Sequence, residues 1–256
     1  IARAEKLVDN ALEEYPEEET ELRIAAASLL YTMGEIGFDD GRVEDAERLF
    51  AKSCKVVSNV PALIKLHDVY FLLNRFESAM SVLEKAEKID LEGTEGAEYL
   101  KAMIFVKKGD VLSAMDQKPA ATASYKRALE VLESGDELME SSPSAAVQKG
   151  FILHHLGEMD ASQAAFRLAI RLNPDRSETY GTLLSFLVVE NRLSDAVEIY
   201  RLAYNQDRIK SMWKIYYSLW VEGLSIRLGK GSSALAKGYL ESVNGDSWQD
   251  RLAGYF

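Results

Sequence analysis

The sequence predicts an all-α protein made of repeated antiparallel helix pairs. Three observations predict this fold: the positions of the prolines, the spacing of the apolar residues, and the recurrence of one set of small and large residues. A helix tolerates proline only in its first turn or just beyond its end. The stretches between the five prolines are long, rich in Ala, Leu, Glu and Lys, and free to be helical. The prolines are Pro16, Pro61, Pro119, Pro143 and Pro174.

Apolar residues recur every three to four positions in these stretches, which is helical spacing. In residues 43–52 the apolar side chains are Val43, Ala46, Leu49 and Phe50. No stretch shows sustained alternation of apolar and polar residues between hairpin turns. Residues 185–189 are strand-like in composition, but they lie inside a helical pattern. The sequence therefore predicts helices and no β-sheet.

Composition excludes several classes of protein. The chain has 256 residues, 47% of them hydrophobic, with only 5 Pro and 16 Gly, so it is neither disordered nor collagen-like. A single cysteine, Cys54, excludes an internal disulfide framework and a cysteine-cluster metal site. No apolar run reaches the roughly 20 residues that a membrane helix needs, so we expect no membrane insertion.

The N-terminus has neither an initiator Met nor a signal-peptide pattern. We therefore expect the chain to begin inside a longer gene product. Without a targeting segment the predicted compartment is the cytoplasm. The alternative is an exported or periplasmic form from which the targeting segment has been removed.

Acidic residues dominate, with a formal net charge of −11, and they are unevenly distributed. Residues 1–50 contain 14 Asp and Glu against 5 Lys and Arg, whereas the last 56 residues contain 5 acidic and 8 basic residues. Nucleic-acid binding needs a basic face that most of this chain lacks, so nucleic acid is not an expected partner.

One set of residues recurs with constant offsets of seven, five, four and three positions. The clearest example is Gly150, Gly157, Ser162, Phe166 and Ala169. Three further segments keep all five positions, and one keeps only the last three. They are Gly34, Gly41, Ala46, Phe50 and Ser53; His67, Asn74, Ala79, Leu83 and Ala86; Leu184, Asn191, Ala196, Tyr200 and Ala203; and Ala121, Tyr125 and Ala128.

Each position of this set has a physical role. Small residues on the two helices let their backbones approach closely, and the large residue fills the space beside them. Gly41, Asn74, Gly157 and Asn191 fall where the first helix must end, and both residue types tolerate a left-handed backbone. Each unit is therefore predicted to be a helix, a tight turn and a second helix.

This pattern resembles the tetratricopeptide repeat, a 34-residue helix–turn–helix unit. The resemblance covers roughly residues 20–243 and is strongest in 143–176 and 177–210. The family's signature Trp is absent and is replaced by Leu30, Leu63, Ala146 and Tyr180. The resemblance implies a right-handed superhelical solenoid of about six repeats, occupying the whole chain as one array. The predicted units are a half repeat at 1–19, then 20–59, 60–93, a longer unit at 94–142, 143–176, 177–210, 211–243, and a closing helix at 244–256.

In this family the first helix of each pair lines a concave groove that binds peptides or helices. The resemblance therefore implies a set of partner-binding residues on the first helices. They are Tyr31, Glu35, Phe38, Ile64, Asp68, Phe71, Val147, Phe151, His154, Ser185 and Val188. Their aromatic and aliphatic character favours an apolar or amphipathic protein segment over a charged tail. The alternative is that several of these aromatic side chains pack between neighbouring repeats.

No residues with catalytic or metal-binding spacing are found. His154 and His155 are adjacent, so on a helix they point about 100° apart and rarely share a metal. His67 replaces a small residue and is predicted to be packed, and Cys54 is predicted to be a small buried side chain. Segment 229–233 lacks the strand and first glycine of a phosphate-binding loop. We expect no catalytic residue, metal or cofactor.

Three functions remain open. The leading one is a non-catalytic scaffold that binds a partner in the groove. The second is a regulatory or substrate-recruiting arm of a larger multidomain enzyme. The third is a structural protein that self-associates through its terminal repeats.

Overall fold

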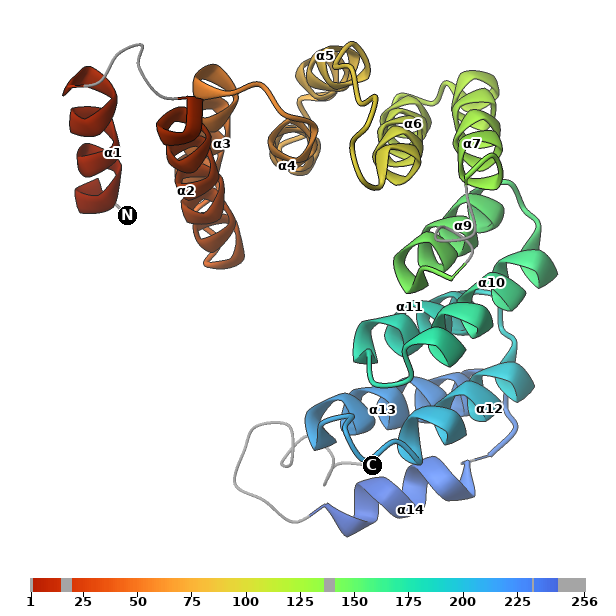
Figure 1. Cartoon of the computed structure of the whole chain (residues 1–256). Coiled ribbons are helices and arrows are strands. Elements are labelled where there is room, and N and C mark those ends of the chain that lie inside the picture. Colours follow the sequence, from red (N-terminus) through yellow and green to blue (C-terminus); the bar gives the residue numbers. More distant parts are fainter. Residues whose placement is uncertain (1, 15–19, 136–140, 232, 244–256) are drawn as a thin grey trace. The chain divides into compact units, whose positions relative to one another are not determined.

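The computed structural model describes residues 2–14, 20–135, 141–231 and 233–243. These residues form helices joined by turns and contain no strand (Figure 1), so the all-α prediction is confirmed. The helices are α1 (Ala2–Glu14), α2 (Thr20–Asp39), α3 (Val43–Val56), α4 (Val60–Leu72), α5 (Phe76–Glu87), α6 (Ala97–Ala114), α7 (Lys118–Glu133), α9 (Pro143–His155), α10 (Met159–Leu172), α11 (Ser177–Val189), α12 (Leu193–Tyr204), α13 (Ser211–Arg227) and α14 (Ala234–Ser242).

The chain divides into two compact units, Ile1–Asp136 and Glu137–Phe256. In the first unit α2 packs against α3, α4 against α5 and α6 against α7, and α1 packs against α2. In the second unit the pairs are α9 with α10, α11 with α12 and α13 with α14. The predicted continuous array and its repeat boundaries stay predictions. The predicted closing helix at 244–256 lies outside the described residues.

Tight turns end the first helix of four of these pairs in the way the spacing predicts. Gly41, Asn74, Gly157 and Asn191 have φ angles of 74°, 55°, 81° and 59°. In each turn the next residue donates its amide to a carbonyl five residues back, as Arg42 does to Gly37 over 2.8 Å. This closing bond satisfies a carbonyl at the helix end, which explains why the turn is so short.

A fifth turn of the same kind was missed from the sequence. Asp116 has a φ of 57°, and Gln117 donates its amide to the carbonyl of Leu112 over 2.8 Å. Seven residues before Asp116 lies Gly109, so α6 and α7 carry the complete five-position set. An aspartate at the turn concealed this half of the repeat, because the other turns use Gly or Asn.

Glycine at the small position of the first helix allows an aromatic ring of the second helix to lie on its backbone. A Cβ added to Gly34 would lie 2.7 Å from the Phe50 ring, and one added to Gly150 would lie 2.7 Å from the Phe166 ring. At Gly109 the distance to the Tyr125 ring would be 2.5 Å. His67 takes this position in α4 and is 1% exposed, which confirms its predicted burial.

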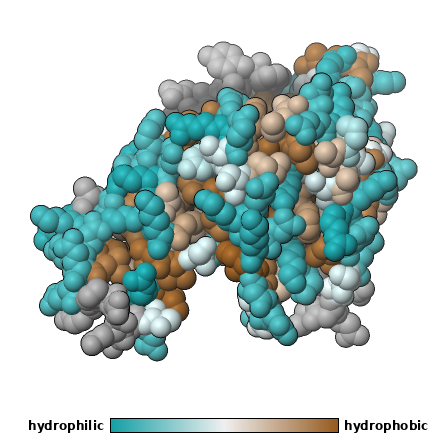
Figure 2. All heavy atoms as spheres, turned by 90° about the horizontal axis from the view of Figure 1, so that it is seen from above, coloured by the Kyte–Doolittle hydropathy of each residue, from teal (hydrophilic) through white to brown (hydrophobic). Residues whose placement is uncertain are grey.

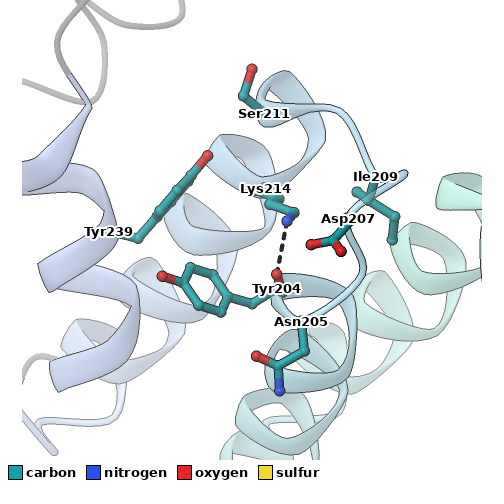
Figure 3. Close-up of a pocket in the computed structure, with 7 residues that line it drawn as sticks. All are labelled: Tyr204, Asn205, Asp207, Ile209, Ser211, Lys214 and Tyr239. Carbon is teal, nitrogen blue, oxygen red and sulfur yellow. Dashed lines mark hydrogen bonds between the residues drawn. The ribbon is translucent and has the colours of Figure 1, made fainter.

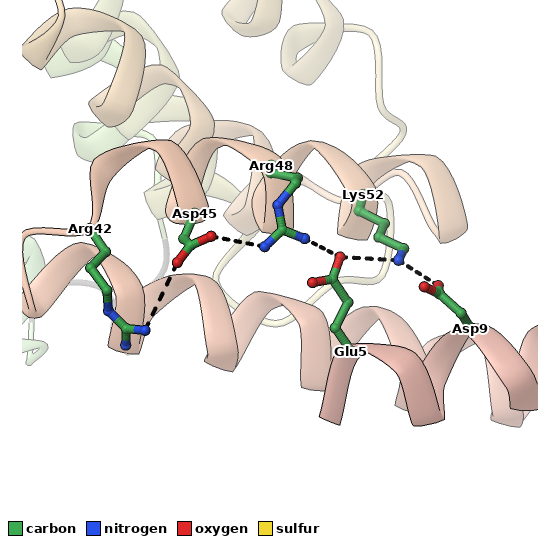
Figure 4. A network of polar contacts seen from close by, with 6 residues as sticks. All are labelled: Glu5, Asp9, Arg42, Asp45, Arg48 and Lys52. Atoms are coloured by element: carbon green, nitrogen blue, oxygen red, sulfur yellow. Dashed lines mark hydrogen bonds and ion pairs between the residues drawn. The ribbon is translucent and has the colours of Figure 1, made fainter. Parts of the chain in front are cut away.

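Ion pairs join second helices of consecutive pairs. The guanidinium of Arg75, the residue before α5, donates to Glu47 on α3 at 3.0 Å. Arg167 on α10 donates to Glu198 on α12 at 2.7 Å. Helix α1 is attached to α3 by the same means (Figure 4), because Glu5 accepts from both Arg48 and Lys52. Each exposed pair contributes at most about 1 kcal/mol to the free energy of folding, so these pairs act on the alignment of the helices more than on the stability of the fold.

Replacing Gly150 by alanine tests the close approach. We expect Gly150→Ala to lower the free energy of unfolding by about 1–3 kcal/mol, because its methyl group would displace the Phe166 ring. The matched control is Gly223→Ala, inside α13, where an added Cβ meets nothing within 4 Å. That variant gains about 0.5–1 kcal/mol from helix propensity. Urea unfolding of both variants measures the difference, and equal effects would contradict the packing argument.

Candidate functional site

In the first unit, predicted groove residues lie on α2 and α4 with their side chains partly exposed. Tyr31, Glu35 and Phe38 project from α2, and Asp68 and Phe71 project from α4. Ile64 is different, because it is only 3% exposed and belongs to the hydrophobic core of the unit. The prediction that Ile64 faces a partner is therefore corrected, since its position in α4 turns it inward.

Glu35 is the centre of a small polar cluster between α2 and α4. The Lys65 ammonium on α4 lies 2.9 Å from its carboxylate, and the Tyr31 hydroxyl donates to it over 3.0 Å. Although burial alone would raise it, these two contacts hold the pKa of Glu35 below its usual value. Burial and the neighbouring Glu35 carboxylate raise the pKa of Tyr31 to about 12, so Tyr31 remains a hydrogen-bond donor at neutral pH.

Asp68 repeats this arrangement one helix pair later. The Lys107 ammonium on α6 lies 2.8 Å from its carboxylate, and His67 Nδ1 lies 3.1 Å from it. Burial opposes ionisation, but the contacts with His67 and Lys107 lower the pKa of Asp68 nonetheless. Each carboxylate is therefore neutralised by a lysine on the first helix of the following pair.

The lysines were not predicted, although the sequence contains a signal for them. Lys65 and Lys107 lie two residues before His67 and Gly109, the small-residue positions of their repeats. Glu35 and Asp68 each lie one residue after that position, as does Asp110, which accepts the Tyr125 hydroxyl over 2.9 Å. A constant spacing thus places acid and base on adjoining first helices.

The corresponding surface of the second unit is aromatic. The His154 ring on α9 stacks on the Phe186 ring of α11, with centroids 3.9 Å apart and an interplanar angle of 7°. Phe151 meets Phe186 and Phe166 edge-on at 5.6 and 5.5 Å. Phe186 was not predicted as a site residue. It lies in the segment 185–189 that the sequence analysis noted only for its strand-like composition.

The remaining predicted residues of this unit flank the aromatic cluster. Val147 and Val188 are partly buried against the core, and Ser185 donates its hydroxyl to the Thr182 carbonyl of its own helix over 2.7 Å. Burial and the neighbouring His155 lower the pKa of His154, which favours the neutral ring. The recess beside His154 measures about 20 Å³, enough for one water and too small for a cofactor.

Another concave feature of the second unit lies where α12, α13 and α14 meet (Figure 3). It has a volume of about 550 Å³, and its lining combines tyrosine rings with polar groups. The Lys214 ammonium donates to the Tyr204 carbonyl over 2.8 Å and lies 5.6 Å from the Tyr204 ring centroid. The lining residues are Tyr204, Asn205, Asp207, Ile209, Ser211, Lys214 and Tyr239.

Cys54 is poorly suited to act as a nucleophile. Burial raises the pKa of the Cys54 thiol to about 11, so the nucleophilic thiolate is scarce at neutral pH.

Over the described ranges, no three His, Cys, Asp or Glu side chains are grouped so that they could hold a metal ion. Among these same residues, no helix combines the length and hydropathy that crossing a membrane requires. On the face shown in Figure 2, hydrophobic side chains are mostly interrupted by hydrophilic ones.

Comparison with known proteins agrees with the geometry. The sequence model of the family described as tetratricopeptide repeat matches residues 61–92 and 143–176. No curated protein matches the chain. Among the solved structures that share its fold are three whose low sequence identity means that they inform on the fold alone.

The first is a thermophilic tetratricopeptide-repeat protein of Thermus thermophilus, with a TM-score of 0.56 and 19% identity over 76% of this chain and 98% of its own. A tetratricopeptide-repeat protein from Parabacteroides merdae has a TM-score of 0.54 and 13% identity over 98% of this chain and 89% of its own. PilF of Pseudomonas aeruginosa has a TM-score of 0.51 and 16% identity over 91% of this chain and 98% of its own.

The ion pairs of the first unit predict a defined response to acid. Because the pKa of Asp68 is lowered from 3.8 in the folded state, its ion pair stabilises the fold above that pH. The stabilisation is lost as the pH falls through the folded value. We expect Asp68→Asn to lower the free energy of unfolding by about 1 kcal/mol at pH 7. The difference from wild type should shrink as the pH falls below 3.8.

The control for this prediction is Asp39→Asn. Asp39 is exposed and forms no ion pair within the residues that the structure describes. That variant should match wild type at both pH values. Chemical unfolding curves at pH 7 and pH 3 provide the measurement. If Asp68→Asn lowered the free energy of unfolding as much at pH 3 as at pH 7, the assignment would be contradicted.

Proposed function

Because this chain is a tetratricopeptide-repeat protein, we propose that it is a non-catalytic scaffold binding a partner peptide or helix along its first helices. Proteins of this family generally act as scaffolds for protein–protein interaction rather than as catalysts. The observation that carries the proposal is the aromatic surface of the second unit, where Phe151, His154 and Phe186 stay partly exposed. The recess beside His154 and Phe186 measures only about 20 Å³.

The chemistry of this surface supports an apolar or amphipathic partner segment. Val147 and Val188 flank the rings with aliphatic side chains that are also partly exposed. Aromatic and aliphatic side chains on a helical groove are suited to the apolar face of a docked helix. The neutral His154 adds a flat, uncharged ring to the same surface.

The first unit supports the same class of partner for a different reason. Its groove carboxylates Glu35 and Asp68 are already paired with Lys65 and Lys107. A charged tail would have to compete with these intramolecular pairs, whereas an uncharged segment would leave them intact. Tyr31, Phe38 and Phe71 supply the apolar contact area beside them.

Two further parts of the proposal follow the sequence analysis. We propose that the chain has no enzymatic activity of its own, in keeping with a Cys54 thiol that is largely un-ionised. For the compartment we propose the cytoplasm, with an exported or periplasmic form as the alternative.

Site-specific photo-cross-linking tests the proposal directly. A photoreactive phenylalanine analogue is placed at Phe38 or at Val188, and the protein is irradiated in lysate of its source cells. Both positions should yield a discrete cross-linked species whose partner peptide is identified by mass spectrometry. The control position is Val189, which is 67% exposed on the same helix as Val188. If the analogue at Val189 cross-linked the same partner equally well, the proposed binding surface would be contradicted.

A pair of neighbouring substitutions gives the quantitative prediction. We expect Val188→Asp to weaken binding of the cross-linked peptide at least about tenfold, because it places a charge within the apolar contact. Val189→Asp, one residue further along α11, should bind within about twofold of wild type. Fluorescence anisotropy with the labelled peptide measures both, and melting curves establish that the variants are folded. Similar affinities for the two variants would contradict the proposal.

A further inference from the structure

A recess in the second unit lies between the second helices α10 and α12. It has a volume of about 360 Å³, and we call it the α10–α12 recess. Its apolar lining consists of Ile170, Pro174, Tyr180 and Leu202, and Arg167 and Arg171 of α10 add positive charge. None of these residues belongs to the predicted groove. The recess lies inside the series of described helices rather than at either end of it.

The apolar part of the recess combines a buried floor with an exposed rim. Ile170 and Tyr180 are 5% and 0% exposed, so the core of the unit holds them in place. The Tyr180 hydroxyl donates to the Pro174 carbonyl over 3.0 Å, which ties α11 to the connection that follows α10. Leu202 forms the rim and is 39% exposed. An apolar group that entered the recess would therefore remove Leu202 from water.

The charges around the recess leave one arginine without a partner. Arg167 donates to both carboxylate oxygens of Glu198, over 2.7 and 2.8 Å. The nearby carboxylate of Asp175 accepts from Arg208 over 2.7 Å. Arg171 lies one turn after Arg167 on the same face of α10, is exposed, and forms no ion pair with any residue that the structure describes. The recess therefore favours a ligand with a single negative charge.

The first unit has a smaller recess at the same position of the repeat, between α5, α6 and α7, with a volume of about 200 Å³. Phe105 there and Tyr180 here each lie four residues before the small position of their repeat. The Arg127 guanidinium lies over the Phe105 ring, 6.0 Å from its centroid, and Glu87 adds a carboxylate to the lining. In the second unit Leu202 takes the position of Arg127, each six residues after the small residue of its second helix. The α10–α12 recess is therefore larger, and none of the described residues that line it is acidic.

We propose that the α10–α12 recess binds a small organic anion, an aromatic or aliphatic body that carries one carboxylate. The body covers Leu202 above the buried Ile170, and the carboxylate pairs with Arg171. The ligand displaces no intramolecular ion pair, because Arg167 keeps Glu198. Pockets for small ligands begin at about 300 Å³, so a recess of this size holds one small molecule rather than a length of chain.

This inference is independent of the scaffold proposal. The proposed partner surface consists of side chains on the first helices α9 and α11, such as Val147 and Val188, whereas the ligand would contact Arg171 and Leu202 on the second helices. Failure of ligand binding would leave the scaffold proposal intact, and the reverse also holds.

The charge requirement is tested with 2-naphthoate and its uncharged counterpart 2-naphthylmethanol, in ligand-observed NMR titrations of the full chain. Wild type should bind 2-naphthoate at least about fivefold more tightly than 2-naphthylmethanol, and the difference should shrink as salt is raised. Arg171→Gln should remove this difference. The matched control is Arg201→Gln on α12, which deletes the same charge at an exposed position outside the recess and should bind both probes like wild type.

The apolar rim is tested by Leu202→Glu, with Leu172→Glu as its matched control. The two leucines are 39% and 38% exposed, but of the two only Leu202 lines the recess. Leu202→Glu should weaken binding of 2-naphthoate at least about tenfold, because its carboxylate would pair with Arg171 in place of the ligand. Leu172→Glu should bind within about twofold of wild type. Circular dichroism establishes that both variants are folded.

Three results would overturn the proposal. They are absence of 2-naphthoate binding to wild type, equal affinities of wild type for the two probes, and equal weakening by Leu202→Glu and Leu172→Glu. Binding of N-acetyl-glycyl-phenylalanine without binding of 2-naphthoate would overturn it in favour of the C-terminus of a protein as the occupant.

Discussion

The contact between a glycine backbone on one helix and an aromatic ring on the next sets the geometry of three helix pairs, and other features of these pairs depend on it. At Gly34, Gly109 and Gly150 the ring of the second helix occupies the space that a side chain would need. Such close packing fixes the separation and the rotation of the two helices. The rotation then decides which residues of the first helix are exposed, which enter the core and which contact the neighbouring pair. His67 occupies the same position in α4 and remains buried, so the arrangement tolerates one flat ring in place of a glycine.

The predicted groove residues differ in chemistry between the two units, although they occupy equivalent positions of the repeats. In the first unit acid and base from adjoining helices neutralise each other, so the surface is polar yet carries little free charge. In the second unit the equivalent helices present stacked and edge-on rings. Residues one position after the small site account for the polar case, because Glu35, Asp68 and Asp110 all lie there.

Periodicity was sufficient to predict the fold, the buried small positions and four of the left-handed turns, because each depends on local sterics. Asp116 concealed a fifth turn, since aspartate adopts that conformation less often than Gly or Asn. Pair contacts were harder to predict. Lys65 and Lys107 are ordinary surface lysines in sequence, and only the stacking of helices brings them to Glu35 and Asp68. Ile64 was assigned to the groove because repeat spacing alone does not show how far a helix is rotated.

The ion pairs also give the helix pairs of the first unit a direction. Each lysine lies two residues before the small position and meets a carboxylate of the helix before it, never of the helix after it. At the corresponding position α2 has the uncharged Thr32. A lysine there would have no carboxylate of a preceding first helix to pair with. Repeats of this chain are therefore not interchangeable modules. A permuted order that put α4 first would leave Lys65 without Glu35, so the order of α2, α4 and α6 is encoded in their electrostatics as well as in their cores.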